Sequence, residues 1–235
     1  MQPMSVECER PPHRGWLALI AFASAGVLLA APATEEDWFE RDWSEQVEAV
    51  SDGELRFLAR PPREKVHHQH NRLTIHDSSL EDGWVDVLQC HEGLDAVPLA
   101  QVVFGRKRTR GVHLVSYRDI GKVWVEGASV QLEEVGPKAE LCVKAEMRTL
   151  TREPDGSYTL LNGPFMRRFL DGYYPLRVSA DVALESRRLA YADIDPPPQP
   201  GFYVWQNGST VHFDAWFDGR LVTRLRFFPQ GGGGS

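Results

Sequence analysis

The chain lacks the short motifs that most directly reveal an enzymatic or cofactor chemistry. It contains no nucleophile elbow (G-x-S-x-G), no phosphate-binding P-loop, no dinucleotide fingerprint, no H-E-x-x-H motif and no paired Cys-x-x-Cys zinc signature. It also lacks a basic excess, because 26 Lys and Arg against 33 Asp and Glu give a net charge of −7, which disfavours a general nucleic-acid binder. With 42% hydrophobic and 25% charged residues, the composition is globular, which excludes a wholly disordered, collagen-like or multi-span membrane protein.

Residues 1–33 have the features of a secretory signal peptide. Arg10 and Arg14 supply a basic start, an apolar stretch follows, and Ala31-Pro32-Ala33 provides the small residues that a signal peptidase accepts. The alternative is an uncleaved membrane anchor, since the uncharged run Gly15–Ala33 is near the lower length limit of a spanning helix. We expect a periplasmic or secreted protein that begins near Thr34 and contacts a membrane only if this segment is retained.

Export decides how the cysteines are interpreted. Of Cys8, Cys90 and Cys142, only the last two remain after cleavage, and two thiols in an oxidising compartment most simply form one disulfide. A Cys90–Cys142 disulfide closes a loop of about fifty residues, which the loop-entropy model values at about 4 kcal/mol. A thiolate metal ligand or a redox thiol is the alternative, but neither cysteine lies in a Cys-x-x-Cys pair.

The hydrophobic pattern predicts a mostly β domain preceded by one helix. Thr34–Val50 has an apolar stripe at helical spacing and acidic residues in its first turn. From Glu54 onward the period becomes two, and short strands are separated by Gly, Asp and Pro turns. We expect an antiparallel sandwich or barrel-like domain over residues 34–195, and no parallel sheet, because helices and strands do not alternate. The predicted strands are Trp84–Cys90, Gln101–Phe104, Val112–Tyr117, Lys122–Val125, Val130–Glu133, Leu141–Leu150, Tyr158–Leu161 and Pro175–Leu184.

A proline-rich connector, residues 196–201, precedes the strongest local signal in the chain. Asn207-Gly208 and Asp218-Gly219 lie between alternating apolar runs, and both dipeptides favour two-residue hairpin turns because such turns need positive φ. We therefore predict a C-terminal three-strand meander over residues 202–230 that packs on the main domain. Residues 231–235 have the composition of a flexible tail.

The most specific polar motif is the run His67-His68-Gln69-His70. On a strand, His68 and His70 share a face and His67 points the other way, so the pair can offer two imidazoles to one metal ion. A further ligand must come from another element, and His91, at the end of a predicted strand, is the nearest candidate. The hypothesis is a copper or zinc site formed by His68, His70 and His91. The alternatives are a solvated polar face and catalysis by one of these histidines.

A second candidate site lies in the segment Asn162–Pro175, which is dense in aromatic residues, Gly and Pro. An arginine there can hold a carboxylate or a phosphate, and neighbouring side chains can line a cleft. The candidate ligand-binding residues are Arg167, Arg168, Asp171, Tyr173 and Tyr174. The alternative is a packed corner in which the aromatic rings fill the core and an Arg pairs with an Asp.

Two further polar features can be binding surfaces or ordinary solvent-exposed faces. His212, Asp214 and Trp216 alternate on one face of the predicted meander, as a binding surface or as a salt-bridged solvent face. Arg106–Arg110 forms a basic loop that can meet an anionic lipid, glycan or partner, or can be a solvated hairpin tip. We therefore predict an exported envelope protein that binds a small ligand or a partner protein. One alternative is a periplasmic hydrolase that uses His91 or the Asp171/Tyr173/Tyr174 corner. The other is a structural accessory subunit that docks on a larger assembly.

Overall fold

The computed structural model describes residues 53–63, 66–169 and 172–230. The predicted signal segment 1–33, the predicted helix Thr34–Val50 and the tail 231–235 lie outside these described residues. Within them the chain is mostly β, as predicted, and its helices are α3 (Ser79–Asp82) and the 3-10 helix η1 (Arg106–Arg108). Neither helix in this part of the chain is long and apolar enough to cross a membrane.

The strands form two sheets and one short ribbon. The larger sheet contains β1 (Arg56–Phe57), β2 (His68–Ile75), β3 (Trp84–Glu92), β4 (Leu99–Val103), β5 (Thr109–Glu126), β6 (Ser129–Arg148), β11 (Leu176–Leu184), β13 (Phe202–Asn207) and β14 (Thr210–Asp218). The smaller sheet contains β7 (Leu150–Arg152), β8 (Tyr158–Phe165), β12 (Leu189–Asp195) and β15 (Leu221–Pro229), and the ribbon contains β9 (Arg168–Phe169) and β10 (Gly172–Tyr173). The larger sheet has the order β1-β14-β11-β2-β3-β6-β4, with β13 beside β14 and β5 beside β6; the smaller has the order β12-β15-β8-β7.

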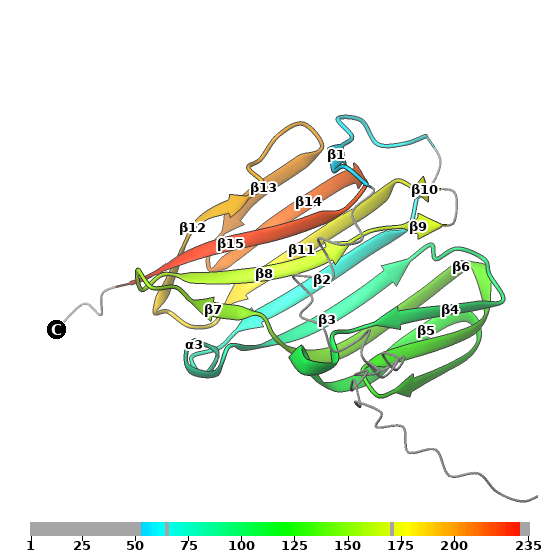
Figure 1. The fold of residues 1–235 in the computed structure, drawn as a ribbon, viewed down its shortest axis with the longest axis horizontal. Coiled ribbons are helices and arrows are strands. Elements are labelled where there is room, and N and C mark those ends of the chain that lie inside the picture. Colours follow the sequence, from blue (N-terminus) through cyan, green and yellow to red (C-terminus); the bar gives the residue numbers. More distant parts are fainter. Residues whose placement is uncertain (1–52, 64–65, 170–171, 231–235) are drawn as a thin grey trace, which may run out of the picture. The chain divides into compact units, whose positions relative to one another are not determined.

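The two sheets pack face to face as a β-sandwich, in which the smaller sheet covers β14, β11, β2 and β3 (Figure 1). Every second residue of β11 and of β14 is buried, which is the period-two pattern that the sequence predicts. Side chains such as Val178 and Phe213 from the larger sheet meet Leu160, Leu225 and Phe227 from the smaller sheet in one core. The predicted sandwich is therefore confirmed.

The larger sheet continues beyond the sandwich as a long hairpin with a core of its own. Leu132 and Leu141 on β6 pack in this second core together with Ile120 on β5. The two strands are 18 and 20 residues long, and three register shifts interrupt their pairing. Such bulges bend a strand and increase its twist. The separately predicted strands Val112–Tyr117 and Lys122–Val125 are consequently one continuous strand.

One strand pair in the larger sheet is parallel, although the sheet as a whole is antiparallel, as expected. β11 lies parallel to β2, with Arg177 as the partner of His68 and Ser179 as the partner of His70. The expectation assumed that parallel strands are joined by a nearby helical crossover. Here the chain leaves β2, builds the hairpin and part of the smaller sheet, and only then returns to β2. No local sequence pattern predicts a connection of that length between two parallel strands.

The C-terminal segment confirms one predicted hairpin and corrects the other. β13 and β14 pair antiparallel across Asn207-Gly208. β15, in contrast, pairs with β8 and β12 in the smaller sheet. Asp218-Gly219 therefore connects one sheet to the other, and the prediction that β15 is the third strand of the meander is wrong. The dipeptide specifies a sharp turn, but the burial of Leu225 and Phe227 in the sandwich decides which sheet the next strand joins.

The corner at Gly219 carries a prediction about stability. A side-chain carbon at Gly219, which has a φ of +82°, would lie 2.2 Å from the carbonyl oxygen of Glu54, whereas Gly208, with a φ of +57°, faces open space. We expect Gly219→Ala to lower the free energy of unfolding by about 2 kcal/mol, from backbone strain and the close approach together. Gly208→Ala, the matched control, should cost about 1 kcal/mol. Urea unfolding compares the two, and equal losses would show that Glu54 does not constrain this corner.

Candidate functional site

The outer face of the larger sheet, opposite the sandwich core, gathers many of the polar side chains that the sequence singles out. Cross-strand register places them in three adjacent rows. The first row contains Trp216, Arg177, His68 and Glu92, the second Asp214, Ser179, His70 and Cys90, and the third Trp205, His212, Asp181 and Arg72. Residues directly opposite each other on a sheet have side chains about 5 Å apart on the same face, so the rows form one continuous surface.

Two histidines, His68 and His70, converge on one oxygen atom and are called the histidine pair below. Nε2 of His68 and Nδ1 of His70 each lie 2.8 Å from Ser179 Oγ. The hydroxyl can bridge both rings because it can donate one hydrogen bond and accept another. Both side chains are partly exposed, at 18% for His68 and 33% for His70. The pair therefore aims two ring nitrogens at a single point that solvent can reach.

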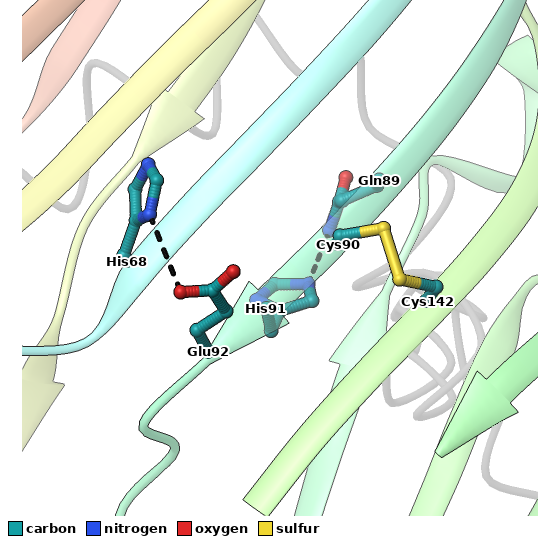
Figure 2. Close-up of a disulfide and its surroundings, with 6 residues drawn as sticks. All are labelled: His68, Gln89, Cys90, His91, Glu92 and Cys142. Atoms are coloured by element: carbon teal, nitrogen blue, oxygen red, sulfur yellow. Dashed lines mark hydrogen bonds and ion pairs between the residues drawn. A yellow bond between two sulfur atoms is a disulfide. The ribbon is translucent and has the colours of Figure 1, made fainter.

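Each member of the histidine pair presents its other ring nitrogen to a carboxylate. His70 Nε2 lies 3.2 Å from Asp181 Oδ2, and His68 Nδ1 lies 3.9 Å from Glu92 Oε2, the contact drawn in Figure 2. The shorter contact can orient the His70 ring, whereas the contact between His68 and Glu92 is too long for a hydrogen bond and acts through charge alone. Burial, assisted by the positive charge of Arg177, lowers the pKa of His68, so this ring is neutral near pH 7 and keeps a lone pair.

Asp181 extends the hydrogen-bonded network to β14. Its second oxygen lies 2.7 Å from His212 Nδ1, so one carboxylate bridges His70 and His212. The Trp205 ring stacks on His212, with the ring centroids 5.3 Å apart and the planes inclined by 11°. The position of the His212 ring is therefore held from both sides.

Arg177 and Asp214 form the salt-bridged part of the same face. Nε and Nη2 of Arg177 lie 3.0 and 2.9 Å from the two carboxylate oxygens of Asp214, and the guanidinium lies 5.1 Å from the centroid of the Trp216 ring. A bidentate salt bridge of this kind fixes the orientation of both side chains. The predicted alternation of His212, Asp214 and Trp216 on one face is present, and its Asp214 end is a salt bridge.

Cys90 and Cys142 form the predicted disulfide. They are direct cross-strand partners on β3 and β6, with their sulfur atoms 2.11 Å apart and their Cα atoms 4.1 Å apart (Figure 2). Cys90 is also the cross-strand partner of His70. The disulfide therefore links β3, the strand next to the histidine pair, covalently to β6.

His91 does not join the histidine pair, which corrects the predicted three-histidine site. It is the cross-strand partner of Gln69, so its side chain faces the interior and is only 5% exposed. There His91 Nδ1 lies 2.9 Å from His67 Nε2, and His91 Nε2 lies 2.7 Å from Gln89 Nε2 (Figure 2). Burial lowers the pKa of His91 to about 3 and that of His67 to about 4. Both rings are therefore neutral near pH 7.

The predicted His68/His70/His91 site is not formed, because His91 is one residue away from the positions of β3 that face the histidine pair. Successive side chains of a strand point to opposite faces, so Cys90 and Glu92 lie on the face of the histidine pair while His91 lies on the other. The register that decides this parity depends on long-range pairing. Within the residues that the structure describes, no group of three or more His, Cys, Asp or Glu side chains is arranged to hold a metal ion.

The second predicted site has internal partners for both of its arginines. Arg167 Nη2 and Nε lie 2.6 and 3.0 Å from the Asp95 carboxylate, and its guanidinium lies 5.5 Å from the Tyr174 ring centroid. The Arg168 guanidinium lies 5.6 Å from the Tyr173 ring centroid, across the β9–β10 ribbon. Of the predicted set, Arg167, Arg168, Tyr173 and Tyr174 lie in the described part of the chain and Asp171 does not. These contacts match the packed-corner alternative, and a ligand role stays a prediction.

Ser179 and Asp181 belong to this site but are not among the residues that the sequence pattern singles out. Both lie in the predicted strand Pro175–Leu184, at the alternate positions that face away from the core. That alternation was the available signal for their exposure. Their place beside His70 follows from the parallel pairing of β11 with β2, for which the sequence has no local signal.

A scan against family models found no match, and searches of curated proteins and of solved structures found none either.

Proposed function

We propose that this protein is an exported binding protein of the cell envelope that takes up a divalent transition metal ion, copper or zinc, through His68 and His70. The observation that carries the proposal is the convergence of His68 Nε2 and His70 Nδ1 on one point, 2.8 Å from each. Imidazole nitrogens suit copper and zinc. Two imidazoles held at alternate positions of a paired strand can chelate one ion with little loss of conformational freedom.

The point on which the two ring nitrogens converge is occupied by Ser179 Oγ, so an ion bound there would displace this hydroxyl. Zinc–nitrogen bonds are about 2.0–2.1 Å long, so each facing nitrogen would also move inward by roughly 0.7 Å. Asp181 and Glu92 lie behind the two rings as outer-shell carboxylates do behind metal-bound histidines. Water would complete the coordination, because the described residues offer no third His, Cys, Asp or Glu ligand there.

Export is supported by two independent features. The N-terminal 33 residues have the composition of a signal peptide. The Cys90–Cys142 pair is joined by a disulfide, and structural disulfides persist mainly in oxidising compartments. Both features favour the periplasm or the exterior as the place where the histidine pair would meet its ion.

Isothermal titration with Cu²⁺ and with Zn²⁺ tests the proposal. In a non-chelating buffer at about pH 7.5, we expect one ion to bind per chain. His68→Ala/His70→Ala should weaken binding at least about tenfold. His113→Ala, which removes an exposed imidazole on β5, is the matched control and should bind as the wild type does. Unchanged affinity in the double variant, or no binding by the wild type, would contradict the proposal.

Hydrolysis is a second candidate function, because Ser179, His70 and Asp181 are linked in the order nucleophile, base and orienting carboxylate. The two contacts are 2.8 and 3.2 Å long. Against it, Ser179 lies inside β11 between two paired strands, so its backbone N–H belongs to the sheet and is not available for an oxyanion. Ser179→Ala separates the candidates, since it should retain metal binding. Hydrolysis of p-nitrophenyl acetate by the wild type that Ser179→Ala abolishes would favour the enzyme.

A further inference from the structure

Within the described residues, the strand β13 is an open edge of the larger sheet. Among the described strands it pairs with β14 alone. The hydrogen bonds from Trp216 N to Gly201 O and between Phe202 and Gln199 fix which backbone groups face β14 and which face away. In an antiparallel pair this direction alternates from residue to residue. The N–H and C=O groups of Val204 and Gln206 therefore point to the open side.

This edge lacks the features that normally keep an edge strand from pairing with another chain. Phe202–Asn207 contains no charged residue, no proline and no register shift. Its outward side chains, Tyr203 and Trp205, are 53% and 51% exposed. Trp205 is already oriented by its stacking on His212, so little freedom is lost when a partner covers it.

We propose that a second copy of this chain occupies the open edge, with β13 paired antiparallel to its counterpart about a two-fold axis at Trp205. In this register Val204 of each copy faces Gln206 of the other, and all four open backbone groups of each strand find partners. Trp205 faces Trp205 of the second copy, and Tyr203 faces Asn207. Side chains of paired residues point to the same face of the sheet only when the two residue numbers differ by an even number. Every pair in this register meets that condition.

Charge and composition favour a second copy at this edge. The chain carries a net charge of −7, so two copies repel except where the facing surfaces are neutral, as β13 is. Tyr and Trp are also the residues that contribute most to protein interfaces. Among the described strands, β4 and β5 are also open edges of the larger sheet, with Leu99 exposed on β4 and Val115 exposed on β5. Contact between β13 and either of these edges would be head-to-tail, whereas contact between two copies of β13 is two-fold symmetric and closes as a dimer. The proposal is independent of metal binding.

Sedimentation velocity of the disulfide-bonded protein in EDTA, from about 1 to about 100 µM, tests this interface. We expect a concentration-dependent dimer. Gln206→Pro should weaken it at least about tenfold, because proline removes an outward-facing donor without removing a bond to β14. Gln101→Pro, the same change on the β4 edge, should leave it intact. A monomeric wild type at all concentrations, or a dimer lost in Gln101→Pro and kept in Gln206→Pro, would overturn the proposal.

Disulfide trapping tests the register and does not depend on the folding of a proline variant. Cα atoms of a non-hydrogen-bonded antiparallel pair lie about 4.5 Å apart, within the range that a disulfide spans. Trp205→Cys should therefore form a covalent dimer on mild oxidation. Asn207→Cys, which faces Tyr203 of the second copy, should not. Equal cross-linking of the two variants would contradict the register.

Discussion

The metal-free protein should lose roughly 3 to 5 kcal/mol of its free energy of unfolding as the pH falls from about 7 to about 4.5. The cause is the buried contact between His67 and His91. Burial lowers the pKa of His91 to about 3 and that of His67 to about 4, from an ordinary value near 6.5. The folded protein holds both rings neutral over this range, whereas the unfolded chain protonates them.

The sign and the size follow from proton linkage. Below about pH 6.5 the unfolded state binds more protons than the folded state, so stability rises with pH and falls on acidification. For every pH unit below its unfolded pKa, each histidine lowers the free energy of unfolding by about 1.4 kcal/mol, until its folded pKa is reached. At about pH 8, well above the unfolded pKa, neither ring is protonated in either state, and this pH dependence disappears.

Urea unfolding in EDTA at several pH values measures this loss. His91→Gln keeps a polar side chain beside His67 and Gln89 but cannot be protonated, so its stability should fall less steeply, by about 1.4 kcal/mol per pH unit. His113→Gln, at an exposed position on β5, controls for the loss of a histidine as such and should follow the wild type. A His91→Gln variant with the wild-type pH dependence would show that this buried ring is not responsible.

Replacing both cysteines, as Cys90→Ser/Cys142→Ser, should cost about 4 kcal/mol in the free energy of unfolding. The two residues are 52 positions apart, so the disulfide removes a long loop from the unfolded ensemble. In the folded state they lie directly opposite each other on β3 and β6, so their replacement leaves the strand pairing possible.

Urea unfolding of the oxidised wild type, the reduced wild type and the double serine variant checks this value. The reduced wild type and the variant should agree, because both lack the cross-link and keep the same strands. A double variant as stable as the oxidised wild type would contradict the prediction and would show that the loop between the cysteines stays ordered in the unfolded state without the disulfide.

Features that depend on one strand and its own turn could be predicted from the sequence. The alternation in Leu176–Leu184 follows from burying one face of a sheet. The Asn207-Gly208 hairpin follows from the positive φ that its two central residues tolerate. The disulfide partners followed from elimination, since only Cys90 and Cys142 remain if the signal segment is removed.

Features that depend on which strands become neighbours could not be predicted. Asp218-Gly219 resembles a hairpin turn, yet the strand after it buries its apolar face in the other sheet. His91 was expected beside His70, but one step of parity places it inside. Ser179 enters the site through the parallel pairing of β11 with β2, whose members are more than one hundred residues apart in the chain.

Anomalous diffraction from crystals grown with Zn²⁺ tests the central claim, a metal site at the histidine pair, most directly. We predict an anomalous peak about 2 Å from both His68 Nε2 and His70 Nδ1, on the outer face of the larger sheet. A zinc ion bound elsewhere and not at this pair, for instance at His76 with Asp86 and Glu185, would contradict the claim.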